Sequence, residues 1–553
     1  MKRLPGSSQS RQLTDSCVRK KTWESSLKKV LPEGEVQERK IKRVNKPRDK
    51  RSMLSSNSSM RTTPVLTPVQ RENLSLEQLS VLPPIKVSYL FSDILPEKFH
   101  ESYVYRGEVG KGANGVVYKG FHLPSKTHRA IKVVKAPENC KVGYSPKEIA
   151  ILKSLDHPSV VRIHEVCKEG EEFYIITEFC EGGTLFDRII REGHFSEEKC
   201  KPLIREVLSG LAYCHSKGIV HRDIKPENLL FESQKPNSIL KIIDFDISAN
   251  FFVETLNTVC GSAYYVAPEI LRGHYTEKVD IWSLGVIFFI MVVGRPPFDG
   301  ESQVEILTKI RDLHMVDFRP AEGKISPLGL ELMAQMLDPR PTMRASAKDL
   351  LKSYWFREEE NSQRTEPAVL NATLKSLRNF RSHNYLQNMI YFYTTSCILH
   401  KEEQSKLTLI FKELDRDNDG RINKSELVDA FVRTGRSFER GQALVESILD
   451  QLQLDQNGIG YREFLLLCAR KQDLMNDESL RRAFDEWDIN KSGVISLQVI
   501  KNAMSNGLFS NIESYEYLFV RDTQPDLINF EQFKEMMMRF VADETLTQSL
   551  SYN

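Results

Sequence analysis

The sequence lacks the usual signals for secretion, membrane insertion and N-terminal lipidation. No apolar run approaches the ~18 residues that a membrane-spanning helix needs. The first residues, MKRLPGSSQSRQ, do not contain the apolar core of a signal peptide, and Lys2 stands where N-myristoylation requires glycine. We therefore expect a cytoplasmic protein, and no lipidation motif supports membrane association.

The sequence also lacks a cysteine framework. Its nine cysteines are irregularly spaced, form no CxxC pair and are odd in number. This pattern argues against a closed set of disulfides and suggests no zinc site. Together with the missing signal peptide, it indicates a protein of a reducing compartment.

A large net charge is absent as well, but the total of +2 conceals an asymmetry. Residues 1–61 hold 17 Lys and Arg against 6 Asp and Glu, whereas the remaining 492 residues hold 60 against 69. We interpret the basic run KIKRVNKPRDKR (40–51) as part of a solvated tail, with nuclear import or binding to an acidic surface left open. No nucleic-acid partner is expected.

The length of 553 residues corresponds to three or four domains. Composition and periodicity divide the chain into a basic and mostly disordered arm (1–100), a main domain (103–356), an amphipathic junction (357–405), a helical segment (406–541) and a tail (542–553). The main domain begins with strand-like alternation and turns helical past Thr184, which predicts two lobes.

A glycine-rich motif lies at the start of the main domain. Gly110, Lys111, Gly112, Gly115 and Val117 fit GxGxxGxV, in which glycines let the backbone close over phosphates. The same glycines would suit a dinucleotide-binding turn, but that turn leads directly into a helix. Here the strand-like GVVYKGF follows, and this order favours a nucleotide-binding hairpin.

Further charged residues complete a template for phosphoryl transfer. Lys132 would hold the α- and β-phosphates and needs a carboxylate partner, a role that suits Glu148, 16 residues later on a helical pattern. In the run HRDIKPEN, Asp223 would orient the acceptor hydroxyl and take its proton, Lys225 would neutralise the phosphoryl group, and Asn228 would bind Mg²⁺. Asp244 in IIDFD would be the second magnesium ligand.

Residues 103–356 resemble a eukaryotic protein kinase. The motifs above, together with APE at 267–269, DIWSLG at 280–285 and Arg344, occur in the order and spacing of that family. The resemblance implies a two-lobed α+β fold, ATP and Mg²⁺ as cofactors, nucleotide contacts at Glu178 and Cys180, and an ion pair between Glu269 and Arg344. Lys225 and the run GSAYYVAPE resemble Ser/Thr kinases, so the expected partners are proteins with Ser or Thr acceptors.

Two residues depart from the family pattern. Asp246 stands where the magnesium motif normally has glycine, and we expect an active enzyme whose Asp244 segment changes conformation less freely. Thr184 replaces an acidic residue that commonly contacts a basic substrate side chain. A preference for substrates with Arg upstream of the acceptor is therefore weakened, although Glu227 is retained.

The activation segment runs from Asp244 to Glu269. Thr255 and Thr258 are candidate phosphorylation sites, and Arg222 is the candidate partner of a phosphate. Glu254 is an alternative source of constitutive negative charge.

The helical segment begins with a complete calcium-binding loop. Asp415, Asp417, Asp419 and Glu426 occupy the carboxylate positions of a 12-residue EF-hand, Arg421 would offer its carbonyl, and Gly420 allows the sharp turn. We call residues 415–426 the first loop, and we expect it to bind Ca²⁺.

Three further hands are degenerate. The second, around LQLDQNGIGYREF, has no register that supplies all ligands. The third retains Asp488, Asn490 and Ser492 but has Val499 in place of the last carboxylate, so any calcium site there is weak. The fourth has Pro525 within its loop and Gln532 at its end. We expect four hands paired into two lobes, with the degenerate ones as packing partners.

A kinase domain, a basic amphipathic junction and four hands in this order resemble the calcium-dependent protein kinases of plants and protists. The resemblance covers residues 103–541 and implies an α+β kinase fold followed by an all-α EF-hand array. It also implies that the junction helix blocks the active site until calcium draws it into the hands. Two alternatives remain: a pseudokinase that acts as a calcium-responsive scaffold, and a kinase whose hands form a constitutive, calcium-insensitive docking module.

Overall fold

The computed structural model describes most of the chain from residue 95 onward. The described residues are 95–96, 99–111, 115–123, 126–136, 147–357, 365–379, 401–452, 458–469, 476–488, 492–496, 527–535 and 537–538. The expectations for the N-terminal arm, for Gly112, for Asn490 and for the second half of the junction lie outside these residues. Among the described residues, no helix is both long enough and apolar enough to cross a membrane.

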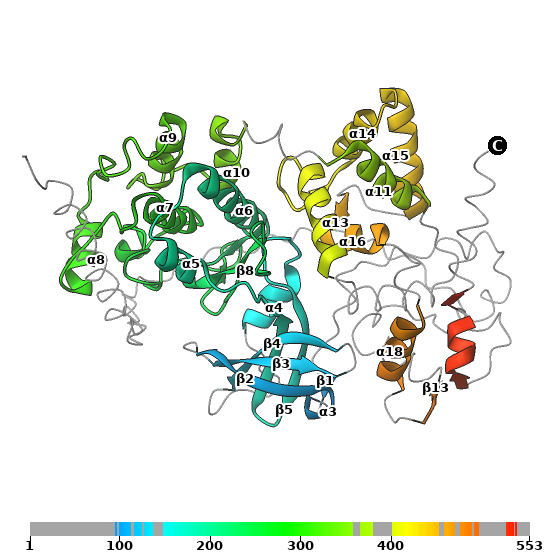
Figure 1. Ribbon diagram of the computed structural model, residues 1–553. Coiled ribbons are helices and arrows are strands. Elements are labelled where there is room, and N and C mark those ends of the chain that lie inside the picture. Colours follow the sequence, from blue (N-terminus) through cyan, green and yellow to red (C-terminus); the bar gives the residue numbers. More distant parts are fainter. Residues whose placement is uncertain are drawn as a thin grey trace, which may run out of the picture.

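The small lobe is built around a six-stranded sheet with the order β1-β5-β6-β4-β3-β2 (Figure 1). Its elements are β1 (Leu95–Pro96), α3 (Phe99–Ser102), β2 (Tyr103–Lys111), β3 (Val116–His122), β4 (Thr127–Lys135), α4 (Lys147–Ser154), β5 (Ile163–Glu169) and β6 (Glu172–Glu178). Strands β2 to β6 pair antiparallel, and only β1 joins in parallel, beside β5. Helix α4 contributes Ile149, Ile151 and Leu152 to the core beneath the sheet.

The large lobe is mostly helical, and α7 lies in its centre. Its elements are α5 (Leu185–Glu192), α6 (Glu197–Ser216), β7 (Ile219–Val220), η3 (Pro226–Asn228), β8 (Leu229–Phe231), β9 (Leu240–Ile242), β10 (Ala249–Asn250), η4 (Ile270–Arg272), α7 (Lys278–Val293), α8 (Gln303–Arg311), α9 (Pro327–Met336), α10 (Ala347–Leu350) and η5 (Tyr354–Phe356). Helix α7 is apolar on all sides, KVDIWSLGVIFFIMVV, and nearly all of it is buried, as expected for such a pattern.

In the C-terminal part, which we call the hand domain, the described residues form helices and two short two-stranded ribbons. It comprises α11 (Pro367–Asn379), α13 (Lys401–Leu414), β11 (Arg421–Ile422), α14 (Lys424–Arg433), α15 (Phe438–Leu452), β12 (Ile459–Gly460), α16 (Tyr461–Cys468), α18 (Asp477–Trp487), β13 (Val494–Ser496) and β14 (Leu527–Asn529). Strand β11 pairs with β12 and β13 with β14, so the first hand joins the second and the third joins the fourth.

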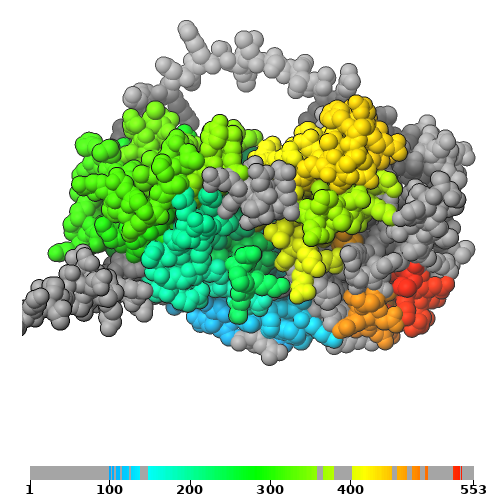
Figure 2. Space-filling view, turned by 45° about the horizontal axis from the view of Figure 1, so that its top comes forward, coloured from blue at the N-terminus to red at the C-terminus, as the bar shows by residue number. Residues whose placement is uncertain are grey.

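The hand domain lies against the back of the kinase domain, away from the glycine-rich hairpin. Arg462 of α16 contacts Asp156, which follows α4, and Lys412 of α13 pairs with Glu206 of α6 at 2.7 Å. A Cβ on Gly420 would lie 2.5 Å from the ring of Tyr213, so the first loop itself touches the large lobe. The surfaces of the two domains lie side by side in Figure 2.

Candidate active site and calcium site

The glycine-rich motif lies in the hairpin formed by β2 and β3. Gly110 pairs with Val117 across the β2–β3 hairpin, and exposed Lys111 pairs with Val116. A Cβ on Gly115 would lie 2.3 Å from the carbonyl oxygen of Val133, so only glycine permits this close approach between β3 and β4.

Lys132 connects the small lobe to the magnesium motif. Its Nζ atom lies 3.1 Å from both carboxylate oxygens of Glu148 and 3.0 Å from Oδ1 of Asp244. Strand β4 therefore meets α4 and the start of the activation segment at one ammonium group. Phe245 is fully buried against the ring of His221, at 4.8 Å between centroids, which holds the segment with Asp244 inward.

The charges of this cluster shift one another's pKa values. Burial opposes the charged form of Lys132, but Glu148 and the two aspartates outweigh it and raise the pKa of Lys132. Burial likewise works against the charge of Asp244, and the ammonium of Lys132 overcomes it and lowers the pKa of Asp244. The aspartate is thus ionised at neutral pH, as a magnesium ligand must be.

The catalytic loop gathers its donors around Asp223. Lys225 Nζ donates to Asp223 Oδ2 at 2.6 Å, and Asn228 Nδ2 donates to the same oxygen at 3.1 Å. Ser262 Oγ donates to Asp223 Oδ1 at 2.9 Å. These three donors fix the carboxylate so that it can orient an acceptor hydroxyl and take its proton.

A buried carboxylate on α7 holds the loop itself in place. Asp280 accepts hydrogen bonds from the backbone N–H groups of His221 (2.9 Å) and Arg222 (2.8 Å). Arg222 has a φ of 70°, a strained conformation that these two bonds stabilise. At the base of the lobe Arg344 Nη2 lies 3.1 Å from Glu269 Oε2, and both side chains are buried, as the resemblance implied.

The residues present fit Mg²⁺ and ATP. Asp244 offers ionised carboxylate oxygens, and Asn228 presents its amide oxygen on the side away from Asp223, because its Nδ2 donates to that residue. Mg²⁺ held by these two residues would neutralise the phosphate oxygens during transfer. Lys132 would bind the phosphates, and Lys225 would supply positive charge beside the acceptor.

The two further residues expected to contact the nucleotide, Glu178 and Cys180, lie where β6 leads into the large lobe. The side chain of Glu178 pairs with Lys241 at 3.0 Å and accepts the N–H of Arg162 at 2.8 Å. It thus faces the interior, and any nucleotide contact at Glu178 would have to come from its backbone. Cys180 is buried, with 8% of its surface exposed.

The activation segment is held by contacts other than those expected. Arg222 donates to the carbonyl of Ile247 at 2.6 Å and to Tyr275 Oη at 3.2 Å. Glu254 forms an ion pair with Lys147 at the start of α4, and both side chains are partly exposed. Thr255 is exposed, and Thr258 is partly exposed. The acidic group of the segment therefore contacts α4 and not Arg222.

Thr184 has a structural role in this conformation. Its hydroxyl accepts the N–H of Asp187 at 3.0 Å, and Asp187 accepts the N–H of Thr184 at 3.3 Å, which forms a capping box at the start of α5. The short hydroxyl side chain suits an N-cap, whereas the acidic residue usual in the related family is longer. The substitution in GGTLFD thus has a local explanation.

The first loop has the geometry of a calcium site. Oxygens of Asp415, Asp417 and Asp419 lie within 4.8 Å of one another. Asp415 accepts the N–H of Gly420 at 3.0 Å, and Glu426 accepts the N–H of Arg416 at 2.8 Å, so the loop wraps around its acidic groups. Gly420 has a φ of 80°, which makes the turn possible.

The carboxylates of the first loop also repel one another. Burial, with the charges of Glu426 and Asp419 adding to it, raises the pKa of Asp415 to about 8. The pKa values of Asp419 and Glu426 are raised by burial as well. Oxygen ligands at EF-hand spacing and mutual repulsion fit Ca²⁺, which would be held by these residues and relieve the repulsion.

The second, third and fourth hands take part in the pairing of hands, but their described residues do not supply a full set of calcium ligands. Arg421, expected to offer its carbonyl, also reaches with its side chain to the carbonyl of Gly458 and to Glu463 in the second hand. In the third hand Asp488 accepts the N–H groups of Ser492 and Gly493 at 2.9 and 2.7 Å. Gln532 of the fourth hand caps a helix start by accepting the N–H of Asn529 at 3.0 Å.

The first half of the junction lies in the hand domain. Leu370, Leu374 and Leu377 of α11 are buried in one apolar cluster with Phe411, Phe464 and other residues of the first two hands. Helix α11 contacts α14, α15 and α16. Its apolar side is therefore covered by hands, whereas Leu386, Met389 and Ile390 lie outside the described residues.

Three contacts around Asp223 and Lys132 were not anticipated from the sequence. They are the bond from Ser262 to Asp223, the anchoring of the catalytic loop by Asp280, and the contact between Asp246 and Lys132. Both Ser262 and Asp280 belong to motifs quoted above, but the motif does not state what each side chain bonds to. Gly261, with a φ of 102°, approaches the carbonyl of Arg222 and so brings Ser262 to the catalytic loop.

Comparison with known proteins agrees with this geometry. Residues 103–356 match the family model of the protein kinase domain, and residues 396–434 match that of an EF-hand domain pair. The chain is 32% identical over 446 residues to calcium-dependent protein kinase 5 of Plasmodium falciparum. The aligned residues make up 78% of this chain and 77% of the relative.

Two other relatives give the same picture. The chain is 33% identical to calcium-dependent protein kinase 4 of Plasmodium berghei, across 80% of this chain and 87% of the relative. It is 32% identical to calcium-dependent protein kinase 13 of Arabidopsis thaliana, across 82% and 86%. With a kinase domain, an EF-hand pair and relatives matched over more than three quarters of both lengths, the chain belongs to the calcium-dependent protein kinase family.

Proposed function

We propose that this protein kinase transfers the γ-phosphate of ATP to Ser and Thr hydroxyls of protein substrates and that calcium at the first loop controls the transfer. The observation that carries the acceptor specificity is the arrangement around Asp223. Lys225 bonds to Asp223 at 2.6 Å and reaches Ser262 at 3.4 Å, while Ser262 bonds to the other carboxylate oxygen. These mutual hydrogen bonds bring the activation segment, which would receive the substrate, next to the carboxylate of Asp223.

The same geometry speaks against a pseudokinase scaffold. Lys132 is paired with Glu148, Asp244 faces the site, and Asp223 and Asn228 are bonded to each other. All the groups that the phosphoryl-transfer template requires are thus assembled, and positioning and charge neutralisation are what that reaction demands.

The regulatory part of the proposal rests on α11. The resemblance to calcium-dependent protein kinases implies that a junction helix leaves the active site when calcium draws it into the hands. Here the leucines of α11 are buried among the helices of the first two hands. We infer that this arrangement corresponds to the active state and that the calcium-free enzyme places the junction against the kinase domain. Because the first loop alone has all its ligands, the calcium response should be shallow.

Phosphotransfer by the whole chain, titrated against free calcium, tests the proposal. Three peptides that differ only in a Ser, Thr or Tyr acceptor are compared, and Asp223→Asn serves as the inactive control. We expect phosphorylation of the Ser and Thr peptides to rise with calcium. Phosphorylation of the Tyr peptide alone would contradict the acceptor specificity, and activity unchanged by a chelator would favour a constitutive docking module.

A further inference from the structure

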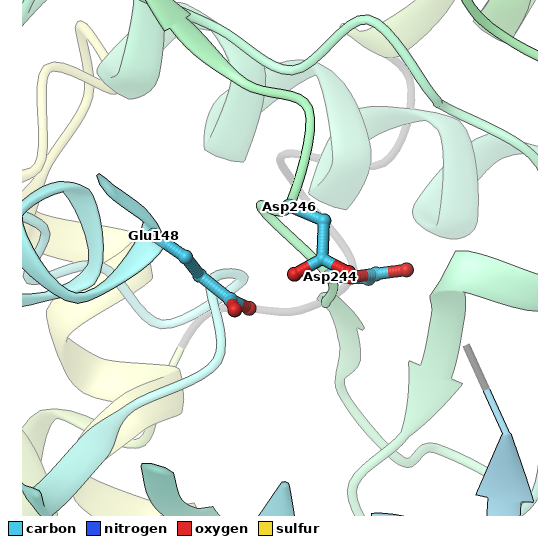
Figure 3. A group of neighbouring side chains, drawn as sticks. All are labelled: Glu148, Asp244 and Asp246. Carbon is cyan, nitrogen blue, oxygen red and sulfur yellow. The ribbon is translucent and has the colours of Figure 1, made fainter. Parts of the chain in front are cut away.

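The residue that replaces glycine in the magnesium motif contacts the phosphate-binding lysine. Figure 3 shows the carboxylate of Asp246 between that of Glu148 and that of Asp244, and Asp246 Oδ1 accepts a hydrogen bond from Lys132 Nζ. The side chain of Asp246 is only 10% exposed. Asp246 is not among the described residues with a positive φ, so the backbone at this position does not need glycine in the present conformation.

The contact changes what Lys132 can offer to a nucleotide. A lysine ammonium has three N–H donors. Those of Lys132 serve four carboxylate oxygens: both oxygens of Glu148, one of Asp244 and one of Asp246. A phosphate oxygen that binds Lys132 must therefore take a donor from one of these three carboxylates.

Asp246 is the carboxylate that can leave without dismantling the site. Glu148 lies on α4, is 7% exposed, and its pair with Lys132 is part of the phosphoryl-transfer template. Asp244 belongs to the magnesium site. Asp246 has neither role, and as an additional carboxylate it also repels incoming phosphates at short range.

We propose that Asp246 acts as a built-in competitor of the nucleotide: it occupies Lys132 in the empty site, and ATP or ADP must displace it in order to bind. This inference rests on the proposed function in so far as the nucleotide is the phosphoryl donor. Asp246 thereby sets nucleotide affinity through Lys132. A kinase of the same design with glycine at this position binds the nucleotide more tightly.

Calorimetric titration of the full chain with ADP, first in EDTA and then with excess Mg²⁺, tests the proposal. Asp246→Gly removes the carboxylate, and Asp246→Asn keeps its volume but removes its charge. We expect both variants to bind ADP roughly tenfold more tightly than the parent in both media, because a hydrogen bond between charged groups is lost from the free state. Asp317→Asn, which removes an exposed carboxylate paired with Arg319, should bind ADP like the parent.

Several outcomes would overturn the proposal. One is an ADP affinity of both variants within about twofold of the parent in EDTA, where a hydrogen bond to Lys132 would have to show. Another is weaker binding only in Mg²⁺, since that would make Asp246 a metal ligand. If Asp246→Gly does not fold, as judged by its melting temperature, the isosteric Asp246→Asn decides.

Kinetics and structure separate this role from a merely structural one. In both variants the KM for ATP should fall by a similar factor, while the KM for a peptide substrate stays unchanged. In a structure of the ADP complex, the Asp246 carboxylate should lie beyond ion-pair distance of Lys132, and a retained contact would contradict displacement. ADP binding requires no phosphotransfer, so an inactive enzyme that still shows the affinity change would refute the proposed function and not the competition.

Discussion

Asp156 and Arg462, 306 positions apart in the chain, join the kinase domain to the hand domain. Arg462 Nε lies 3.0 Å from Asp156 Oδ1, and the backbone N–H of Arg462 donates to Asp156 Oδ2 at 3.1 Å. Asp156 follows α4, the helix that carries Glu148, and its own N–H donates to Tyr213. One ion pair therefore connects the second hand with the helix that positions Lys132.

Breaking this pair should loosen the hand domain from the kinase domain. Arg462 is 7% exposed, and the side chain of Asp156 is 29% exposed. Removing one partner of such a pair leaves a poorly solvated charge, and we expect Asp156→Ala to weaken the docking by about 2 kcal/mol. Hydrogen exchange of α16 and α4 in the full chain measures this loosening.

A charge exchange controls for simple damage to the fold. Asp156→Arg combined with Arg462→Asp should restore part of the protection from exchange that either single variant loses. Exchange rates in α16 that are unaffected by Asp156→Ala would show that the pair does not hold the domains together.

Calcium regulation should depend on the first loop. Asp415→Ala combined with Glu426→Gln removes two of its carboxylates, and we expect the calcium concentration for half-activation to rise by roughly tenfold or more, with most of the activation lost. Phosphotransfer against free calcium measures it. The matched variant Asp488→Ala in the third hand should have a small effect, and a steep response abolished only by that variant would contradict the assignment.

Activity should not require phosphorylation at Thr255. Arg222 is already bonded to Ile247 and Tyr275, and Glu254 already links the activation segment to Lys147 of α4. We expect Thr255→Ala to retain activity within about twofold and Glu254→Lys to lower kcat by up to about fivefold, because an exposed pair contributes at most about 1 kcal/mol. Steady-state assays of unphosphorylated protein measure both; a large loss in Thr255→Ala would be the opposite result.

The small lobe should lose stability in mild acid through His122. This side chain is 5% exposed, and burial, with the charge of Arg129 adding to it, lowers the pKa of His122 to about 3. The unfolded chain takes up this proton near pH 6.5, whereas the folded chain stays neutral. The free energy of unfolding is therefore independent of the titration of His122 above about pH 6.5. Below that pH it falls by about 1.4 kcal/mol per pH unit, toward pH 3, because the unfolded chain binds a proton that the folded chain does not.

Guanidinium unfolding at pH 7 and pH 5.5 measures this pH dependence. His122→Gln should remove its share of the difference between the two pH values, and the exposed His274→Gln should leave the difference unchanged. An identical pH dependence in His122→Gln and the parent would show that this histidine does not carry the effect.

Several features of the site followed from the sequence because they depend on local patterns. The hairpin glycines, the loop from His221 to Asn228 and the 12 residues from Asp415 are short segments whose spacing already specifies their backbone turns and side-chain types. The pair between Lys132 and Glu148 could also be expected, since each residue fits a motif with a known partner.

Other features could not be predicted in this way, because they join segments that are distant in sequence. Asp246 could be recognised as a departure from glycine, but its bond to Lys132 depends on the buried position of Phe245 and on the ion pair that holds Lys132 of β4 against Glu148 of α4. The capping box of Thr184 is a different case, because it joins residues only three positions apart. The sequence contains this local signal, but we interpreted Thr184 as a substrate contact and not as the start of α5.

By itself, the sequence determined the chemistry available to this protein: which residues can hold phosphates and cations, and in what order the domains follow. Only the tertiary structure decided which of these groups share a partner and which domain face meets which. Residue type and spacing act within a few turns of chain, whereas the contacts of Asp246 with Lys132 and of Asp156 with Arg462 arise only when packed cores bring distant segments within hydrogen-bond range.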